Sequence, residues 1–382
     1  MRVVMSQPKL RDKFPILNHS TFLVSHSMGA APSDSQNKLL EYWNSWNSLG
    51  IVAWEHWMPF VDECRVLLGK IIGAPSTSIA FHQNVSTLIH SVLGTFDWTR
   101  TRNEVLVSQL TFPTLKYCLE VLRGTGIQII QVPSRDGISH DPSDFTSLIS
   151  DRTALVMVDH GIYRSSALVD IPPITQVAHQ HGARVLVDTY QTAGMYPFSV
   201  TDWGVDFAVG GSHKWLCGGP GASYLYVRPE LLGALKPRLY GWMAQQDIFG
   251  FTPEVQPADD ARAFMTGTFG IPSLYAARTG WEIILEVGIP SIRKHVLHIS
   301  HHIIRLAQER NLKINSPLED DARGGQVCIG IDHAHKIESL LAKDRIFLDS
   351  RPYCGLRISG HFYTEEREVQ DCFNALDSII KR

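Results

Sequence analysis

Residues 183–227 read ARVLVDTYQTAGMYPFSVTDWGVDFAVGGSHKWLCGGPGASYLYV. The first apolar run in this stretch ends on Asp188, and the second leads through two glycines and a serine to His213 and Lys214. A glycine-rich turn at 218–221 separates the second run from a third. Short apolar runs bounded by turn residues predict buried strands, and we expect these three to lie in the core of an α/β fold.

The positions of Asp188 and Lys214 in this stretch suggest a chemical role for each side chain. An Asp that ends a buried strand lies at the carboxyl edge of the sheet, where open α/β folds bind ligands. A lysine on a glycine-flanked turn at the same edge is shielded from water, which lowers its pKa from about 10.4. A neutral amine can bond covalently to pyridoxal phosphate, and an Asp can keep the pyridine nitrogen protonated. Taken singly, Asp188 can instead be a helix cap and Lys214 a solvated surface residue.

The stretch resembles the fold-type I pyridoxal-phosphate enzymes of the class V aminotransferase group. Within that group it is most similar to kynureninase-like proteins, through WGVDFAVG at 203–210 and GGPG at 218–221. The resemblance implies that pyridoxal 5'-phosphate is the cofactor, that Lys214 holds it covalently, and that Asp188 pairs with its pyridine nitrogen.

Two neighbouring positions depart from kynureninases. His213 stands where a Tyr usually precedes the lysine, and Gln191 stands where a His usually follows the Asp. Both residues are similar to the desulfurase and aminotransferase members of the group. The resemblance implies that Gln191 hydrogen-bonds the phenolic oxygen of the cofactor and that His213 reaches its phosphate. The departures leave the cofactor assignment intact and the substrate open.

Further cofactor contacts are expected upstream. The polar turn at 82–87 opens a helix, and the free N–H groups and positive dipole end there form a natural phosphate site. The kynureninase-like pattern places phosphate contacts at Val85 and Ser86, and a simple helix cap is compatible with this role. Phe112 follows the strand at 104–108 and is implied to stack on the cofactor ring, with a buried loop residue as the alternative.

Substrate contacts are expected from three segments. LRIS at 356–359 is similar to the class V signature in which an arginine clamps the substrate α-carboxylate, and a guanidinium suits that two-point geometry. Arg357 is therefore the main candidate and Arg351 a second. Ser27 and His160 are further candidates by resemblance. A plain turn explains Ser27 better, and a strand-edge histidine explains His160 equally well.

The loop after residue 227 supplies two more candidates. Thr268 follows Gly267, and this pair resembles the Gly-Thr with which class V proteins reach the phosphate of the neighbouring subunit, which implies a homodimer. Trp242 is counted with the cofactor-binding candidates. Kynureninases usually show Asn-Pro shortly after the Gly-Thr. Here Pro272 follows Gly270 and Ile271, so the chain lacks the Asn amide that is expected to bind the aromatic substrate.

Composition limits the possible classes of protein. The chain has 382 residues, 44% of them hydrophobic and 19% charged, with a net charge of -3. We expect a soluble globular enzyme that binds no nucleic acid and no membrane and carries no signal peptide. Six scattered cysteines without CxxC favour a reduced cytoplasmic protein. No metal is expected, because the four histidines between 295 and 302 have neither HExxH spacing nor a carboxylate pair.

The order of predicted elements gives the fold class. Strands and helices alternate from 104 to 188, which predicts a mostly parallel sheet covered on both faces. We expect a fold-type I pyridoxal-phosphate transferase-like α/β fold, with a large domain built on that sheet and a smaller C-terminal α/β lobe. The predicted segments are an irregular N-terminal arm at 1–50, the large cofactor-binding domain at 51–272, connecting helices at 273–310 and the small domain at 311–382.

The leading hypothesis is a pyridoxal-phosphate enzyme that acts on an α-amino acid. Lys214 and Asp188 are its predicted catalytic residues. The expected reaction is kynureninase-like cleavage or elimination at Cβ, of a C–C or C–S bond, in a substrate other than kynurenine. Amino transfer and epimerisation by a class V enzyme are the alternatives, and a non-catalytic relative that keeps the fold as a scaffold is a more distant one.

Overall fold

The large sheet is the centre of the molecule. The computed structural model describes residues 8–381. Its seven-stranded sheet has the spatial order β2 (Ile79–His82), β8 (Ser223–Val227), β7 (Phe207–Gly211), β6 (Arg184–Asp188), β5 (Thr153–Asp159), β3 (Glu104–Ser108) and β4 (Gln128–Val132). The strands from β7 to β4 run parallel, whereas β8 is antiparallel to both of its neighbours. The mostly parallel sheet and the α/β class predicted from the sequence are confirmed.

Apolar strands and short crossover helices explain this sheet. β5, β7 and β8 are buried along their whole length, as continuous apolar runs between two helical layers require. Four helices pack around the sheet: α4 (Val85–Leu93), α5 (Pro113–Glu120), α6 (Pro142–Thr146) and α7 (Ile171–Gln180). Each crossover carries the chain back to the edge where the next parallel strand begins, so the carboxyl ends of the parallel strands lie together at the opposite edge.

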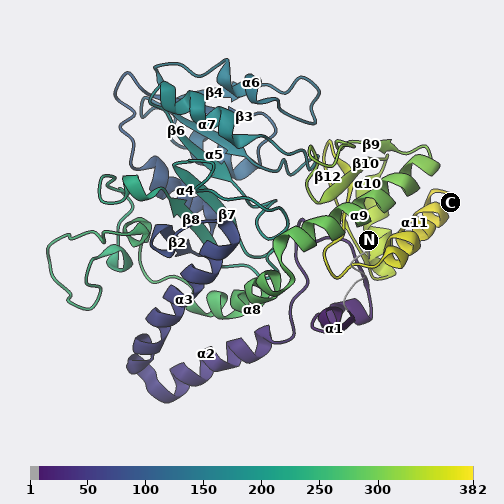
Figure 1. The fold of residues 1–382 in the computed structure, drawn as a ribbon, viewed down its shortest axis with the longest axis horizontal. Coiled ribbons are helices and arrows are strands. Elements are labelled where there is room, and N and C mark those ends of the chain that lie inside the picture. Colours follow the sequence, from purple (N-terminus) through teal and green to yellow (C-terminus); the bar gives the residue numbers. More distant parts are fainter. Residues whose placement is uncertain (1–7, 382) are drawn as a thin grey trace.

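A second, smaller lobe lies beside the first (Figure 1). Its antiparallel sheet has the order β12 (Asp349–Arg351), β13 (Gly355–Ser359), β10 (Gln326–Gly330) and β9 (Lys313–Ile314). It contains α10 (Ala334–Lys343) and α11 (Glu366–Ile380), and it has its own apolar core, in which Val327, Ile358 and Phe373 are fully buried. The predicted C-terminal α/β lobe is therefore present.

Two long helices connect the lobes. α8 (Ile271–Val287) is capped by Gly288. α9 (Ile289–Glu309) begins directly after this glycine and runs into the small lobe (Figure 1). Short 3-10 helices occupy Pro15–Asn18, Gly50–Ala53, Ser76–Ser78, Pro229–Leu231, Trp242–Ala244 and Ala261–Phe264. The predicted boundaries near residues 50, 272 and 310 stay predictions.

The N-terminal segment joins both lobes and is less irregular than expected. After α1 (Pro8–Arg11), β1 (Thr21–Phe22) pairs in parallel with β11 (Ile346–Phe347) of the small lobe. The chain then forms α2 (Ser35–Leu49) and α3 (Trp54–Ile72) along the large lobe (Figure 1). α2 lies within the stretch predicted as an irregular arm, and none of its residues is buried.

Two general expectations can be compared with the described residues. All six cysteines are buried and none forms a disulfide. Within residues 8–381, no helix has both the length and the hydropathy that crossing a bilayer requires.

Candidate active site

Three adjacent strands end at the same edge of the large sheet and carry ionisable residues there. β5 ends on Asp159 and β6 on Asp188, and these two residues are direct register partners. β7 ends at Gly211 and leads into the turn that holds His213 and Lys214. Because the carboxyl ends of parallel strands meet at one edge, the fold brings two carboxyl groups and one amine together.

The amine of Lys214 reaches into a cavity between aromatic rings. Its Nζ lies 4.5 Å from the ring centroid of Tyr190 and 5.5 Å from that of Phe112. Removal from bulk water lowers the pKa of this amine to about 8, although the charge of Asp188 acts in the opposite direction. About a tenth of the lysine is therefore neutral and nucleophilic at pH 7, far more than for a lysine of ordinary pKa.

The lysine turn is held in place by a distant part of the chain. The backbone N–H of Gly29 donates to the carbonyl of His213 at 2.8 Å. A Cβ on Gly29 would lie only 2.2 Å from the carbonyl oxygen of Lys214, so no other residue fits this close approach. The Gly29 segment, which the sequence predicted as a loop, therefore forms part of the wall behind Lys214.

The cavity at this edge has a volume of about 270 Å³ and faces the N-terminus of α4. Val85 and Ser86, the predicted phosphate contacts, line it together with Gln83 and Asn84. The side chain of Asn84 caps the helix by accepting from the N–H of Thr87 at 2.9 Å. The first N–H groups of the helix have no partner within the helix, which creates an anion-binding end on the wall of the cavity that Lys214 lines.

The two carboxyl groups differ in their hydrogen bonds. One oxygen of Asp188 accepts from the N–H of Tyr190 at 2.8 Å. Burial raises the pKa of Asp188, whereas this N–H and the nearby Lys214 act to lower it. Asp159, which the sequence analysis did not single out, lines the same cavity and is only 4% exposed. Burial, followed by the charge of Asp188, raises the pKa of Asp159 to about 7.

Phe112 and His213 also line the cavity, as predicted for cofactor contacts. The ring of Phe112 meets the edge of Tyr163 with a centroid separation of 5.2 Å. His213 Nδ1 is 2.9 Å from the hydroxyl of Tyr190. Burial, assisted by the charge of Lys214, lowers the pKa of His213 to about 4 and keeps its imidazole neutral.

Gln191 lines the cavity, but its amide is already engaged by the protein. Its Nε2 donates to the carbonyl of His26 at 3.1 Å, and its Oε1 accepts from Trp215 Nε1 at 3.1 Å. One N–H of the amide is left for a ligand. The predicted bond from Gln191 to a phenolic oxygen stays a prediction.

Arg357 and Ser27, two predicted substrate contacts, lie together in a buried cluster. Arg357 forms a two-point ion pair with Asp349, in which Nε donates at 2.7 Å and Nη2 at 2.5 Å. Nη2 also donates to Ser27 Oγ at 2.9 Å, and Nη1 donates to the carbonyl of Tyr163 at 2.8 Å. Ser27 in turn donates to Asp349. The arginine fork therefore already holds a carboxylate that belongs to the chain.

The charges of this cluster leave a positive excess. His26 Nε2 is 2.9 Å from Asp349, and burial lowers the pKa of His26 to about 4, so the imidazole is neutral at pH 7. The partners His26 and Arg357 hold the pKa of Asp349 well below its ordinary range. Arg351, the second candidate, lies 3.0 Å from the same carboxylate. Two guanidinium groups thus share one carboxylate, and these charges also act on Lys214.

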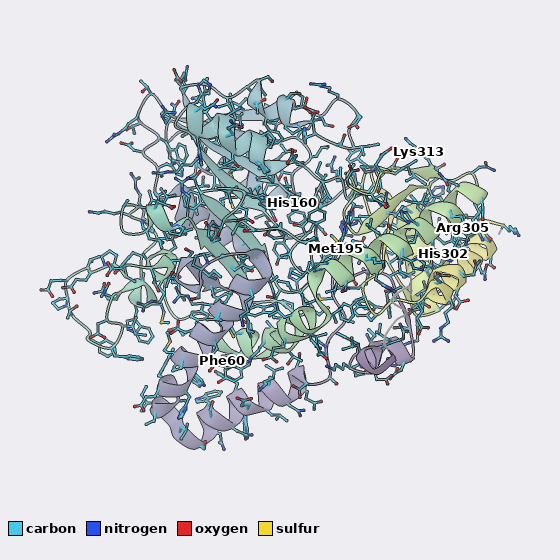
Figure 2. The ribbon with its side chains drawn as sticks, viewed as in Figure 1. Phe60, His160, Met195, His302, Arg305 and Lys313 are labelled. Atoms are coloured by element: carbon cyan, nitrogen blue, oxygen red, sulfur yellow. The ribbon has the colours of Figure 1, made fainter. Side chains whose placement is uncertain are left out.

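Besides the residues of the Arg357 cluster, three further predicted site residues do not line the Lys214 cavity. His160 packs against Trp203 with ring centroids 4.6 Å apart, bonds Thr192 Oγ1 at 2.9 Å and lines a separate cavity; Figure 2 shows it in the interior of the molecule. Trp242 packs edge-on against Trp54 at 5.3 Å. Thr268 is exposed. The roles predicted for these three residues stay predictions.

The histidines of α9 each have a different neighbour. His298 bonds Glu366, His301 bonds Asp320, and the ring of His302 contacts Arg305, which Figure 2 shows beside it on α9. Within the described part of the chain, no group of three or more His, Cys, Asp or Glu side chains could hold a metal ion.

The sequence analysis missed three residues of this site. Asp159 ends a strand at the same edge as Asp188, and that shared position was a signal that could have revealed it. Tyr190 lies two residues after Asp188, but nothing in the sequence shows that its ring contacts Lys214. Asp349 lies two residues before Arg351, in a strand of only three residues without apolar alternation.

The residues present fit pyridoxal phosphate. The cavity contains a nucleophilic amine on Lys214, an acid on Asp188 for a ring nitrogen, and a helix N-terminus for a phosphate. The side chain of Phe112 offers an aromatic face, and one buried oxygen of Asp159 has no protein partner. Each functional group of the cofactor therefore has a complementary group on the walls of this cavity.

Comparison with known proteins agrees with this arrangement. The family model described as Aminotransferase class-V matches residues 30–371. An uncharacterized aminotransferase, YcbU of Bacillus subtilis, is 30% identical over 97% of this chain and 97% of its own length. A kynureninase of Bacillus cereus is 30% identical over 94% of this chain and 88% of its own length.

A solved structure has a similar fold. C-DES, in a mutant with glycine covalently linked to its pyridoxal phosphate cofactor, superposes with a TM-score of 0.89 at 21% identity. The match covers 96% of this chain and 98% of that chain.

The ion pair of Arg357 can be tested by Asp349→Asn. We expect the free energy of unfolding at pH 7 to fall by about 3–5 kcal/mol, because a buried arginine loses its counter-charge. Urea unfolding measures this change, with Asp371→Asn on the exposed face of α11 as the control, for which we expect less than about 0.5 kcal/mol.

The pH dependence of this effect has a definite sign. Because the pKa of Asp349 is lowered by folding, its contribution is complete above the unfolded pKa of about 3.9 and is lost as the pH falls below it. The difference in free energy of unfolding between the wild type and Asp349→Asn should therefore become smaller only at acidic pH. Equal stability at pH 7 would show that the pair contributes nothing.

Proposed function

The chain belongs to the class-V aminotransferase family, and on this basis we propose that it cleaves or eliminates a group at Cβ of an α-amino acid other than kynurenine. It is an enzyme whose cofactor is pyridoxal phosphate. The observation that carries the proposal is the placement of Lys214, Asp188 and the N-terminus of α4 around one cavity. Amino transfer or epimerisation of an α-amino acid is the alternative reaction at the same site.

Lys214 and Asp188 are the proposed catalytic residues. When bound, pyridoxal phosphate supplies a ring that accepts electrons from a bond broken at the substrate. Lys214 is the covalent anchor of the cofactor, and its amine then takes and returns the Cα proton of the substrate. Its pKa of about 8 suits both tasks near neutral pH. Asp188 keeps the pyridine nitrogen protonated.

The other cavity residues orient the cofactor. The N–H groups at Val85 and Ser86 bind its phosphate, and the neutral imidazole of His213 adds a donor. Phe112 covers one face of the ring. Gln191 uses its remaining N–H toward the phenolic oxygen. These contacts fix the plane of the ring and hence the substrate bond that can be broken.

The Arg357 cluster is the proposed receptor of the substrate α-carboxylate. Nε and Nη2 of Arg357 are occupied by Asp349, and one N–H on Nη1 is left over. Arg351 brings a second guanidinium, and its side chain is 41% exposed. Because two arginines face one carboxylate, the cluster can take up one more anion without leaving an unpaired negative charge.

Three positions support a substrate other than kynurenine. His213 and Gln191 replace the Tyr and His of the kynureninase pattern, and the segment at 270–271 lacks the expected Asn. A site that hydrogen-bonds a substrate group discriminates by about 10⁴-fold against analogues without it, so the loss of such donors removes the corresponding preference. The kynureninase relatives therefore support a reaction at Cβ of the substrate, but they give less support to an aryl ketone as the substrate.

A homodimer is proposed from exposed apolar surface. α2 buries none of its residues and exposes Trp43 and Trp46 at 52% and 57%. The loop at 247–255 exposes Phe251 at 74%. Exposed large aromatic side chains are typical of an interface. The exposed Thr268 is free in this arrangement to reach the cofactor phosphate of the partner subunit.

We place the enzyme in the cytoplasm. Six buried, unpaired cysteines support this assignment, since thiols persist in a reducing compartment.

The covalent anchor is tested with Lys214→Ala, with Lys116→Ala as a matched control on α5. After incubation with pyridoxal phosphate and borohydride reduction, peptide mass spectrometry should find the cofactor on residue 214 of the wild type and of Lys116→Ala. Lys214→Ala should bind none and keep its circular dichroism. The rate of capture should rise with pH through about 8, as the amine loses its proton. A wild type that takes up no cofactor would instead support the scaffold alternative.

The reaction type is tested on the holoenzyme with kynurenine and a panel of β-substituted amino acids. We expect release of pyruvate or another Cβ cleavage product from a panel member, and weak or no release of anthranilate from kynurenine. Anthranilate, pyruvate and the pyridoxamine form of the cofactor are followed together. Efficient anthranilate release would identify a kynureninase, and accumulation of the pyridoxamine form would identify amino transfer.

The dimer is tested by sedimentation velocity. The double variant Trp43→Glu, Trp46→Glu should sediment as a monomer because charges replace the apolar face of α2. Ile380→Glu, on the exposed side of α11, should leave the dimer intact. A wild type that is fully active as a monomer would contradict the proposal.

A further inference from the structure

A second carboxyl group faces the cofactor cavity beside Asp188. Asp159 and Asp188 are register partners at the ends of β5 and β6, and both line the cavity. Neighbouring strands are about 4.8 Å apart, so their carboxyl groups are close enough to interact strongly. They are 4% and 6% exposed. Two like charges at this separation, screened by little water, are not both ionised at neutral pH.

The hydrogen bonds decide which carboxyl group keeps the proton. Asp188 accepts a 2.8 Å bond from the N–H of Tyr190 and is attracted to Lys214, both of which stabilise its anion. Asp159 Oδ1 receives only a 3.5 Å contact from the N–H of Phe112, and its buried Oδ2 has no partner among the described residues. A buried anion without donors is costly, so the proton belongs on Asp159.

The surroundings of Asp159 add one weak counter-charge. Burial and the charge of Asp188 on β6 raise the pKa of Asp159, while the hydroxyl of Thr111 and the backbone N–H of Phe112, both in the segment before α5, act to lower it. Lys116 on α5 interacts with Asp159, but its Nζ donates to the carbonyl of Gln109. An uncharged acid at the cavity wall is therefore a stable state near neutral pH, with the pKa of Asp159 at about 7.

We propose that Asp159 is a second catalytic acid, which carries the single proton of the Asp159–Asp188 pair and donates a hydrogen bond from it to the phenolic oxygen of bound pyridoxal phosphate. The phenolic oxygen and the ring nitrogen lie on the same side of the pyridine ring, because one ring carbon separates the nitrogen from the carbon that bears the oxygen. Two adjacent carboxyl groups match that spacing, with Asp188 on the nitrogen and Asp159 on the oxygen. The inference rests on the proposed function, because it requires the cofactor to bind.

The consequence is a pH-dependent cofactor environment. Below a pH of about 7 the neutral Asp159 donates to the phenolic oxygen. Above it, the ionised Asp159 repels that oxygen, and the donor is lost. The proton remains between these two oxygens, so no bond between heavy atoms forms or breaks. Cofactor absorption and affinity should both change across this pH.

The test compares the holoenzyme with Asp159→Asn, which keeps a donor and cannot ionise. Infrared spectra between about pH 5 and pH 9 should show a protonated carboxyl band that disappears near pH 7 in the wild type and is absent from Asp159→Asn. The visible absorption of the cofactor should change over the same pH range in the wild type only. Asp159→Leu, which has no donor, should bind the cofactor at least about tenfold more weakly.

Asp206→Asn is the matched control. Asp206 is a buried carboxylate next to β7, paired with His179 and Arg228, and it does not line the cavity. This variant should keep both pH-dependent signals. Unchanged signals in Asp159→Asn would overturn the inference while leaving the proposed function intact. A wild type that fails to capture pyridoxal phosphate on Lys214 would instead overturn the proposed function.

Discussion

Keeping one lysine amine out of bulk water is the constraint on which the rest of this structure depends. Lys214 has to reach the cavity while protein fills the space behind it. The chain meets this requirement with a glycine at the end of β7 and with Gly29, whose missing side chain lets a distant segment pack against the lysine turn. The resulting loss of solvation lowers the pKa of the amine.

The same constraint explains why the two lobes are joined through charged groups. Arg357 of the small lobe bonds the carbonyl of Tyr163 in the large lobe and Ser27 in the N-terminal segment. Its charge is balanced by Asp349. Displacement of either segment would leave a donor of this buried guanidinium without its acceptor, so the arginine ties the three segments together. The side chain proposed to bind the substrate carboxylate thus also forms the contact between the lobes.

Much of this arrangement was predictable from sequence where apolar runs are long. The predicted bounds of β5, Thr153–Asp159, agree with the structure, whereas β7 was expected at 205–209 and is found at Phe207–Gly211. The shift arises because its two glycines pair with β8 without showing any side-chain pattern. Asp349 and the direction of the Gln191 amide depend on contacts between distant segments, which no local periodicity encodes.

The contact between Gly29 and His213 has a consequence for the order in which the molecule folds. The Gly29 segment leaves the ribosome long before the lysine turn exists, and β1 has to wait longer still for its partner strand β11. Contacts between such distant positions form slowly, because the entropy of closing the intervening chain is lost before any contact rewards it. The central sheet can assemble without them. The wall behind Lys214 is therefore complete only when two segments far apart in the chain have come together.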